Sequence, residues 1–373
     1  MEQKKCWSLF IRHTDREKYE PEVLSLLPVQ LVGKAIQQTG VPVASAEMNS
    51  SVPTPRSFWA VYQWIRRRKP AVVQTWMYHA DVIGGVAARL AGVPVVWGIH
   101  QSNLDPAVNT RNTMVSAKLG RLLSSKLPEK IVCCSFASER THTAFGYDSA
   151  KMQVIHNGFE TPAVSLNSMN VAGETLREEL GIGHEEFVIG LVARFNPQKD
   201  HAAFLEAARR LHRTHQERDI RFVLCGLHVE WQNPEFAALI PEGQHSNFGK
   251  SLHLLGRRSD MDRVYAAMDL LSTSSVGEGL PLVVGEAMAR GVPCVVTDVG
   301  DSAYVVGETG WVVPPADPAA LAARWEVCAE MGRRQLKGYG EMARRRIETE
   351  LHIDTAVQKY HDLYTQIYER RYS

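Results

Sequence analysis

Short runs rich in β-branched residues alternate with longer amphipathic stretches along nearly the whole chain. In the first half, these runs predict strands at Glu22–Leu27, Ala71–Thr75, Val93–Ile99, Lys130–Cys134 and Gln153–His156. In the second half, they predict strands at Phe187–Ala193, Arg221–Cys225, Leu252–Leu255, Leu270–Thr273 and Cys294–Thr297. Helical patterns separate them, for example at Ala80–Ala91, Ala202–His212 and Leu282–Arg290. Apolar strands separated by helices are typical of parallel sheets that are covered on both faces.

The two series of strands predict two doubly wound α/β domains in tandem. A length of 373 residues also exceeds the usual size of a single domain. The boundary is predicted near the polar segment Thr161–Glu174, after an Asn-Gly pair that favours a tight turn. We therefore expect a first domain at residues 1–160 and a second at 161–353. The helical pattern at 354–371 predicts a helix that packs back on the first domain.

Composition narrows the function classes without identifying one. The chain has 42 basic and 41 acidic residues, a balance that argues against a nucleic-acid partner. It contains no CxxC pair, so its six cysteines are interpreted as reduced core thiols of a cytoplasmic protein. No run approaches the roughly 18 apolar residues of a membrane-spanning helix, and the N-terminus lacks the apolar region of a signal peptide. We predict a cytoplasmic protein that is at most peripheral to the inner face of a membrane.

The strongest local signal is the segment Leu270–Arg290, which predicts a strand, a loop with two glycines and a helix starting near Pro281. Glycines let a backbone approach a ligand closely, and a helix N-terminus suits a phosphate group. Glu278 lies in the loop and Glu286 on the helix, so the two carboxylates can face one ligand. Paired carboxylates suit acid–base chemistry or hydroxyl recognition. The alternative is that Glu278 only caps the helix while Glu286 is solvated.

A second signal is LVARFNPQK at 191–199, another predicted strand that runs into a loop. Arg194 and Lys199 would project from the carboxyl end of the first strand of the second domain, where open α/β sheets bind ligands. A guanidinium together with an ammonium group suits a diphosphate. The alternative is a pair of exposed loop cations.

The segments VIHNGFE, LVARFNPQKD, LLGRRSDM and EGLPLVVGEAMARGVPCVVTDVG resemble the retaining group 1 glycosyltransferases of family 4. The resemblance extends from about Leu9 to the C-terminus and is densest in the second half. An E-x7-E motif is characteristic of that family, and Glu278 and Glu286 have its spacing. The resemblance implies a GT-B fold, in which two Rossmann-like domains face a cleft. It also implies that no metal is required.

The resemblance assigns roles to residues of the predicted donor domain. Glu286 would bind the ribose hydroxyls of a nucleoside diphosphate sugar, and Glu278 would contact the transferred sugar. The backbone amides of Gly279 and Leu280 would bind the phosphates.

Further roles follow from the same resemblance. Arg194 and Lys199 would neutralise the leaving diphosphate, while Gly256 and Arg257 would lie against the base. In the first domain, His100 follows a predicted strand and would face the donor sugar. The alternative for His100 is a structural histidine.

Three weaker patterns complete the candidate chemistry. His79 and Asp81 follow a predicted strand and are expected to line the acceptor side. Asp260-Met261-Asp262 spells an Asp-x-Asp, but we predict that Asp260 caps a helix beginning at Met261 and that no metal binds there. The run Phe58–Lys69 combines aromatic residues with cations, which suits an anionic membrane surface. It equally suits a helix whose last turn is basic.

The start of the chain departs from the family pattern. Family members begin with a strand and a glycine-rich loop, whereas Trp7–Ile11 already resembles the end of the first helix and residues 13–27 resemble the approach to the second strand. We expect that first central strand to be missing, which would leave a gap in the core. Either the sequence starts beyond it, through a misassigned start or a truncation, or another element fills the gap.

The resulting hypothesis is a transferase of polysaccharide biosynthesis. It would move a hexose-type unit with retention from a nucleoside diphosphate sugar, expected to be a UDP-sugar, to a glycan or lipid-linked saccharide. Two alternatives stay open: a nucleotide-sugar epimerase of the same architecture, and a truncated, non-catalytic nucleotide-sugar-binding protein. A dehydrogenase is not favoured, because no GxGxxG follows a predicted strand.

Overall fold

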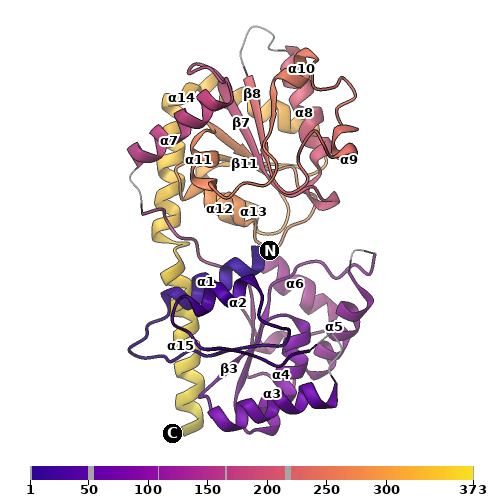
Figure 1. The fold of residues 1–373 in the computed structure, drawn as a ribbon, viewed down its shortest axis with the longest axis vertical. Coiled ribbons are helices and arrows are strands. Elements are labelled where there is room, and N and C mark those ends of the chain that lie inside the picture. Colours follow the sequence, from indigo (N-terminus) through magenta and orange to yellow (C-terminus); the bar gives the residue numbers. More distant parts are fainter. Residues whose placement is uncertain (1, 49–53, 108, 164–165, 215–219, 373) are drawn as a thin grey trace. The chain divides into compact units, whose positions relative to one another are not determined.

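The computed structural model describes residues 2–48, 54–107, 109–163, 166–214 and 220–372 (Figure 1). The chain divides into two compact units. Unit 1 consists of Met1–Gly158 together with Ile353–Ser373, and unit 2 consists of Phe159–His352. Unit 1 contains a four-stranded and a two-stranded parallel sheet, unit 2 contains a six-stranded one, and each unit has its own hydrophobic clusters.

Unit 1 contains a four-stranded parallel sheet in the order β3-β4-β5-β6. Its strands are β3 (Val73–Gln74), β4 (Val95–Ile99), β5 (Lys130–Cys133) and β6 (Met152–Val154). Helix α3 (Pro55–Arg68) precedes β3, while α4 (Tyr78–Leu90), α5 (Arg111–Leu123) and α6 (Phe136–Phe145) follow β3, β4 and β5, and α15 (Ile353–Tyr372) closes the unit. A short 3-10 turn lies at Ser149–Lys151.

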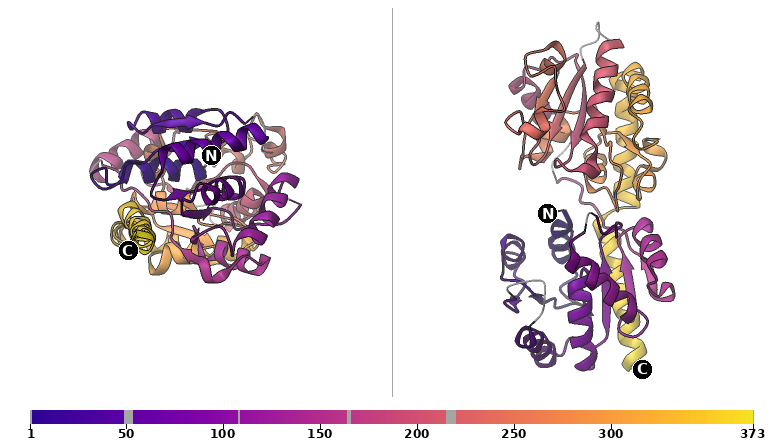
Figure 2. Two further views of the ribbon diagram at one scale, coloured as in Figure 1. Left: turned by 90° about the horizontal axis from the view of Figure 1, so that it is seen from below. Right: turned by 90° about the vertical axis from the view of Figure 1, so that its right-hand side faces the viewer.

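The central strand β4 shows how this sheet is covered on both faces. Side chains alternate along a strand, so neighbours point to opposite faces. Trp97 and Ile99 pack into the core beneath α3, α4 and α5, whereas Val96 packs against Val357 and Tyr360 of α15. The C-terminal helix therefore belongs to the core of unit 1 and runs along its sheet in Figures 1 and 2.

A separate two-stranded sheet lies near the start of the chain, in the region where we expect the first central strand to be missing. It consists of β1 (Val23–Ser25) and β2 (Val43–Ser45), with α1 (Glu2–His13) and α2 (Leu31–Gln37) as its helices. Among the described residues, no strand hydrogen-bonds this sheet to the four-stranded one. Side chains of α1 connect the two sheets instead. The ring centroids of Trp7 and Trp76 lie 3.7 Å apart, and those of Phe10 and Tyr360 lie 5.0 Å apart. Both α1 residues also pack on the cluster beneath β1 and β2.

Unit 2 contains a six-stranded parallel sheet in the order β12-β11-β10-β7-β8-β9. Its strands are β7 (Phe187–Val192), β8 (Ile220–Cys225), β9 (Leu252–Leu254), β10 (Leu270–Ser272), β11 (Cys294–Thr297) and β12 (Trp311–Val313). The helices are α7 (Leu166–Glu179), α8 (His201–Thr214), α9 (Pro234–Ala237), α10 (Asn247–Lys250), α11 (Met261–Ala266), α12 (Leu282–Met288), α13 (Ser302–Val306) and α14 (Pro318–Thr349). Short 3-10 turns lie at Pro197–Lys199 and Gly307–Thr309.

Helix α14 contributes to both cores of unit 2. Its first half places Leu321 and Trp325 in the core that includes α8, while Ala343 and Ile347 join the core that includes α12. The helix is interrupted at Gly332, whose φ of +74° is one that glycine adopts without a steric penalty.

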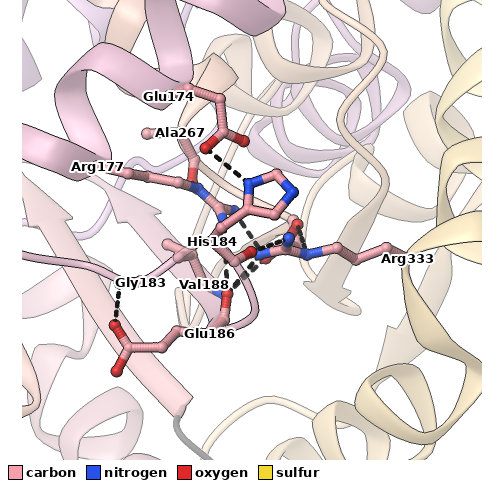
Figure 3. Close-up of polar contacts among 9 residues, drawn as sticks. Glu174, Arg177, Gly183, His184, Glu186, Val188, Ala267 and Arg333 are labelled. Atoms are coloured by element: carbon pink, nitrogen blue, oxygen red, sulfur yellow. Dashed lines mark hydrogen bonds and ion pairs between the residues drawn. The ribbon is translucent and has the colours of Figure 1, made fainter.

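A network of charged side chains connects the amino ends of β7 and β10 (Figure 3). Asp269, which directly precedes β10, accepts hydrogen bonds at 2.8 Å from the Arg177 guanidinium and from the Val188 amide. Arg333, just past the interruption in α14, approaches its other carboxylate oxygen to 3.1 Å. Arg177 and Asp269 are 4% and 12% exposed, so this ion pair is largely buried.

Glu186 extends the same network at the start of β7. Its carboxylate accepts from Arg221 at 2.6 Å and from the Gly183 amide, and its carbonyl accepts from Arg333 at 2.6 Å. Burial alone would raise the pKa of Glu186, but Arg221 and the Gly183 amide hold it below its usual value. The network therefore ties α7, α14 and the strands together.

All ten predicted strands are present, although β2 and β12 were not predicted. The predicted helices Ala80–Ala91, Ala202–His212 and Leu282–Arg290 correspond to α4, α8 and α12. The six cysteines are buried and form no disulfide, as expected for core thiols. Within the described ranges, no helix is long and apolar enough to cross a bilayer.

Candidate active site

Two residues predicted from separate motifs meet at the carboxyl edge of the sheet in unit 2. Lys199 lies in the loop after β7, and Glu278 lies in the loop after β10. The Lys199 Nζ donates to Glu278 Oε1 at 2.5 Å, and Ser275 Oγ donates to the same oxygen at 2.7 Å. Both charged side chains are only 10% exposed. The interpretation of Lys199 as an exposed loop cation is therefore wrong.

The backbones of these loops are fixed to one another. Ser274 donates its hydroxyl to the Lys199 carbonyl at 2.8 Å, and the Val276 amide donates to the Gln198 carbonyl at 2.9 Å. On the other side, the Asp301 amide donates to the Gly279 carbonyl at 2.9 Å. The loops after β7, β10 and β11 thus form one connected surface.

Two glycines allow these loops to pack closely. A Cβ at position 226 would lie 1.8 Å from the Ala193 carbonyl oxygen, so only glycine fits there after β8. Gly300 has a φ of +59°, and a Cβ there would lie 2.5 Å from the Glu278 carbonyl oxygen. A glycine at each point is required by sterics, which maintains the loop arrangement at the sheet edge.

Glu286 lies on α12 and its carboxylate is oriented by a neighbouring tyrosine. Tyr265 donates its hydroxyl to Glu286 Oε2 at 2.8 Å, and the Arg290 guanidinium lies 5.1 Å from the centre of the Tyr265 ring. Burial, followed by the charge of Glu286, raises the pKa of Tyr265 well above its usual value, so this hydroxyl stays a donor. The sequence gives no signal for Tyr265, which lies on α11.

The capping alternative for the two glutamates is wrong. The residue at the N-cap of α12 is Pro281, whose side chain makes no capping bond. Glu278 binds Lys199 and Ser275, while Glu286 is half-buried and binds Tyr265.

The remaining candidates of unit 2 lie at the same ends of the strands. Arg194 is exposed just after β7, and Arg257 is exposed after β9. Gly256 has a φ of +60° and accepts from the Gly226 amide at 2.8 Å, which joins the loops after β8 and β9. Leu280 is buried, with 9% of its surface exposed.

The prediction that Asp260 caps α11 is partly wrong. Asp260 does occupy the N-cap position of a helix that starts at Met261, but its side chain makes no capping bond. Arg258 binds both of its carboxylate oxygens, at 2.8 and 2.5 Å, because a guanidinium fork matches a carboxylate. Asp262 instead accepts from Arg290 at 2.8 Å. No group of residues suited to holding a metal occurs in the described part of the chain.

In unit 1, His100 lies at the carboxyl end of β4. It is 7% exposed, and its ring stacks on Trp76 at 4.2 Å between centroids. Burial lowers the pKa of His100 to about 3, so its imidazole is neutral near pH 7.

The prediction that Asp81 lines the acceptor side is wrong. The residue is 1% exposed, and its carboxylate accepts a hydrogen bond from Thr75 Oγ1 at 2.6 Å. Asp81 therefore belongs to the core and does not line an acceptor surface. His79 is half-buried.

Comparisons with known proteins place the chain in a family. The family model described as "Glycosyltransferase Family 4" matches residues 9–162, and that described as "Glycosyl transferases group 1" matches residues 186–330. Together the two models account for most of the chain. The fold is GT-B, with two Rossmann-like domains. The chain belongs to the group 1 glycosyltransferases of the family 4 type.

Two curated relatives give the range of sequence similarity. The "UDP-Gal:alpha-D-GlcNAc-diphosphoundecaprenol alpha-1,3-galactosyltransferase" of Escherichia coli is 28% identical over 68% of this chain and 64% of the relative. The "Putative glycosyltransferase EpsF" of Bacillus subtilis (strain 168) is 29% identical over 59% of this chain and 56% of the relative. The chain therefore spans less than two thirds of the length of either relative.

Two solved structures share the fold. Anabaena Alr3699/HepE in complex with UDP has a TM-score of 0.80 at 19% identity, covering 97% of this chain and 96% of that one. A glycosyltransferase from Rickettsia africae ESF-5 has a TM-score of 0.81 at 18% identity, covering 98% and 94% of the two chains.

Proposed function

We propose that this protein transfers a sugar, with retention, from a UDP-sugar to a glycan or a lipid-linked saccharide. The observation that carries the proposal is the pairing of Lys199 with Glu278 at the carboxyl edge of the sheet in unit 2. The donor is supported by the E. coli relative, whose name specifies UDP-Gal, and by the structural neighbour that was solved with UDP. The acceptor class is supported by the diphosphoundecaprenol in that relative's name.

The proposed roles follow the chemistry of the side chains. Glu286, held by Tyr265, accepts hydrogen bonds from the ribose hydroxyls. Lys199 and Arg194 neutralise the charge that grows on the diphosphate as its bond to the sugar breaks, which is an electrostatic contribution to catalysis. Glu278 contacts the transferred sugar.

Three further assignments complete the donor site. The amides of Gly279 and Leu280 bind phosphate oxygens, and Gly256 with Arg257 lies against the base. His100 contributes a neutral imidazole that faces the donor sugar.

In the proposed reaction, the acceptor oxygen forms a bond to the anomeric carbon on the face from which the diphosphate departs. Because the acceptor oxygen itself attacks the anomeric carbon, no side chain acts as a covalent nucleophile, and the acceptor proton passes to the leaving phosphate oxygen. Neither a metal nor a cofactor enters the proposal, because the basic residues Arg194 and Lys199 supply positive charge for the diphosphate.

The epimerase alternative is not favoured, since the relatives and the family models are glycosyltransferases. An epimerase would interconvert UDP-sugars without an acceptor, whereas a transferase releases one UDP for each sugar that it transfers to an acceptor. A non-catalytic binding protein would bind the donor and show no turnover with any acceptor.

The first test is calorimetric titration with UDP. We expect micromolar binding to the parent protein and at least about tenfold weaker binding to Glu286→Ala and to Arg194→Ala, since each loses hydrogen bonds that involve a charged group. Glu348→Ala is the control, because its carboxylate is 44% exposed and pairs with Arg344 one turn earlier on α14. A folded protein that binds none of UDP, GDP and ADP would contradict the proposal.

A second prediction concerns Tyr265. Tyr265→Phe removes only the hydroxyl that binds Glu286, so UDP binding should weaken by about five- to tenfold, the typical value of one hydrogen bond. In the Glu286→Ala background the same change should have little further effect, because its partner is already absent. Tyr368→Phe, at an exposed tyrosine of α15, provides the matched control. Equal, independent losses in both backgrounds would show that Tyr265 does not act through Glu286.

A further inference from the structure

Helix α5 of unit 1 carries an apolar ridge that faces outward. The ridge consists of Val115, Leu119 and Leu122, whose side chains are 49%, 44% and 63% exposed. These positions lie four and three residues apart, so they form one stripe along the helix. The opposite side of α5, with Met114 and Ala117, packs into the core. The ridge is therefore a surface feature that the core of unit 1 does not require.

Cations surround this ridge. Arg111, Lys118 and Arg121 are exposed on the same helix, and α5 contains no acidic residue. Between residues 48 and 128 the sequence has ten lysines and arginines but only two acidic residues, Asp81 and Asp105. Asp81 lies in the core, so it does not offset the surface charge. This excess is local, because the whole chain has 42 basic and 41 acidic residues.

Helix α3 adds a second face of the same kind. Helix α4 packs against both α3 and α5, and all three cover the same face of the four-stranded sheet (Figure 1). Helix α3 exposes Trp59, which is 56% exposed, and lacks acidic residues. The exposed cations of α3 and its C-cap are Arg56, Arg66, Arg67, Arg68 and Lys69. Of these, Arg68 pairs with Glu22 at 3.1 Å, so the other four carry the surface charge of this helix. Aliphatic, indole and basic side chains are thus combined on the outward faces of α3 and α5.

We propose that the outward faces of α3 and α5 dock on an anionic lipid bilayer. Charge complementarity selects this occupant: lysine and arginine side chains pair with headgroup phosphates, while leucine and tryptophan side chains enter the boundary with the acyl chains. A basic excess without apolar side chains would suit any polyanion. The apolar ridge of α5 and Trp59, by contrast, are buried only when they enter an apolar medium. The docking rests on the exposure and charge of these helices alone and is independent of the proposed sugar transfer.

The test is co-sedimentation of the full chain with vesicles. We expect binding to vesicles of equal parts phosphatidylglycerol and phosphatidylcholine, weak binding to pure phosphatidylcholine, and loss of binding at about 0.5 M NaCl, where surface charges are screened. Leu119→Ser combined with Leu122→Ser should lower the partition coefficient at least about tenfold, since two apolar side chains no longer enter the bilayer. Lys118→Glu combined with Arg121→Glu should abolish binding.

Matched controls lie in unit 2. Val171→Ser with Val327→Ser removes two exposed apolar side chains, and Arg334→Glu with Lys337→Glu reverses two exposed cations. Both controls should bind vesicles as the parent does. All variants should bind UDP in solution like the parent, so that failure of docking is distinguished from failure of the proposed function.

Two outcomes would overturn the proposal. One is a folded chain that does not bind the anionic vesicles, or whose ridge variants bind as well as the parent. The other is a parent dimer that the ridge substitutions convert to a monomer in sedimentation velocity without any vesicle binding, because the ridge would then contact a second copy of the chain.

Discussion

Replacing Lys199 by methionine is expected to lower kcat/KM for sugar transfer by about 100- to 1000-fold, the usual effect of removing one group that stabilises developing charge. The lysine is held at the sheet edge by its 2.5 Å bond to Glu278, and its carbonyl is fixed by Ser274. A preorganised cation of this kind costs no reorganisation when charge develops on the diphosphate. The loss should therefore appear mainly in kcat, with a smaller change in KM.

The Lys199→Met variant also leaves the Glu278 carboxylate without its cation. Combining it with Glu278→Gln also removes the negative charge that Lys199 neutralises, and the double variant should regain thermal stability but not activity. Lys337→Met, at an exposed lysine of α14, is the control and should keep full activity. If Lys199→Met transfers sugar at the parent rate, Lys199 has only a structural role.

The strands that could be predicted from sequence have recognisable apolar runs, both in the middle of a sheet and at edges such as β3, β6 and β9. Strand β4 is completely buried, and its run of β-branched residues is unmistakable. The two strands that were missed, Val43–Ser45 and Trp311–Val313, have three residues each and lie at sheet edges with partly exposed side chains. Three partly exposed residues offer too few buried apolar positions to give a recognisable run.

The candidate site was predictable only as far as local motifs extend. Lys199, Glu278 and Glu286 belong to recognisable segments, but that Lys199 contacts Glu278 depends on the packing of loops 79 residues apart. Tyr265 was missed because its bond to Glu286 joins two helices that pack through the core.

One wrong interpretation, for Asp81, and one partly wrong interpretation, for Asp260, have different causes. Burial of Asp81 depends on how α4 lies over the sheet, which no local pattern encodes. The capping role expected for Asp260 was replaced by its two bonds to Arg258, since a nearby guanidinium competes with backbone amides for the same oxygens.

The charged network at the opposite end of the strands should determine the stability of unit 2. Asp269 binds Arg177, Arg333 and the Val188 amide, and Arg177 is only 4% exposed. Removing one partner of a buried ion pair leaves the other charge uncompensated, which costs about 3–5 kcal/mol. We therefore expect Asp269→Ala to lower the free energy of unfolding of unit 2 by about that amount.

Hydrogen exchange of peptides from β7 and β10, measured across a urea series, reports on unit 2 separately from unit 1. Asp262→Ala is the matched control: this aspartate also binds an arginine, but it is 53% exposed, so its loss should cost less than about 1 kcal/mol. The contrast isolates burial, because both substitutions remove a carboxylate from an arginine in the same unit. Equal destabilisation by the two would mean that Arg177 is solvated when Asp269 is removed, and that the network does not hold β7 and β10 together.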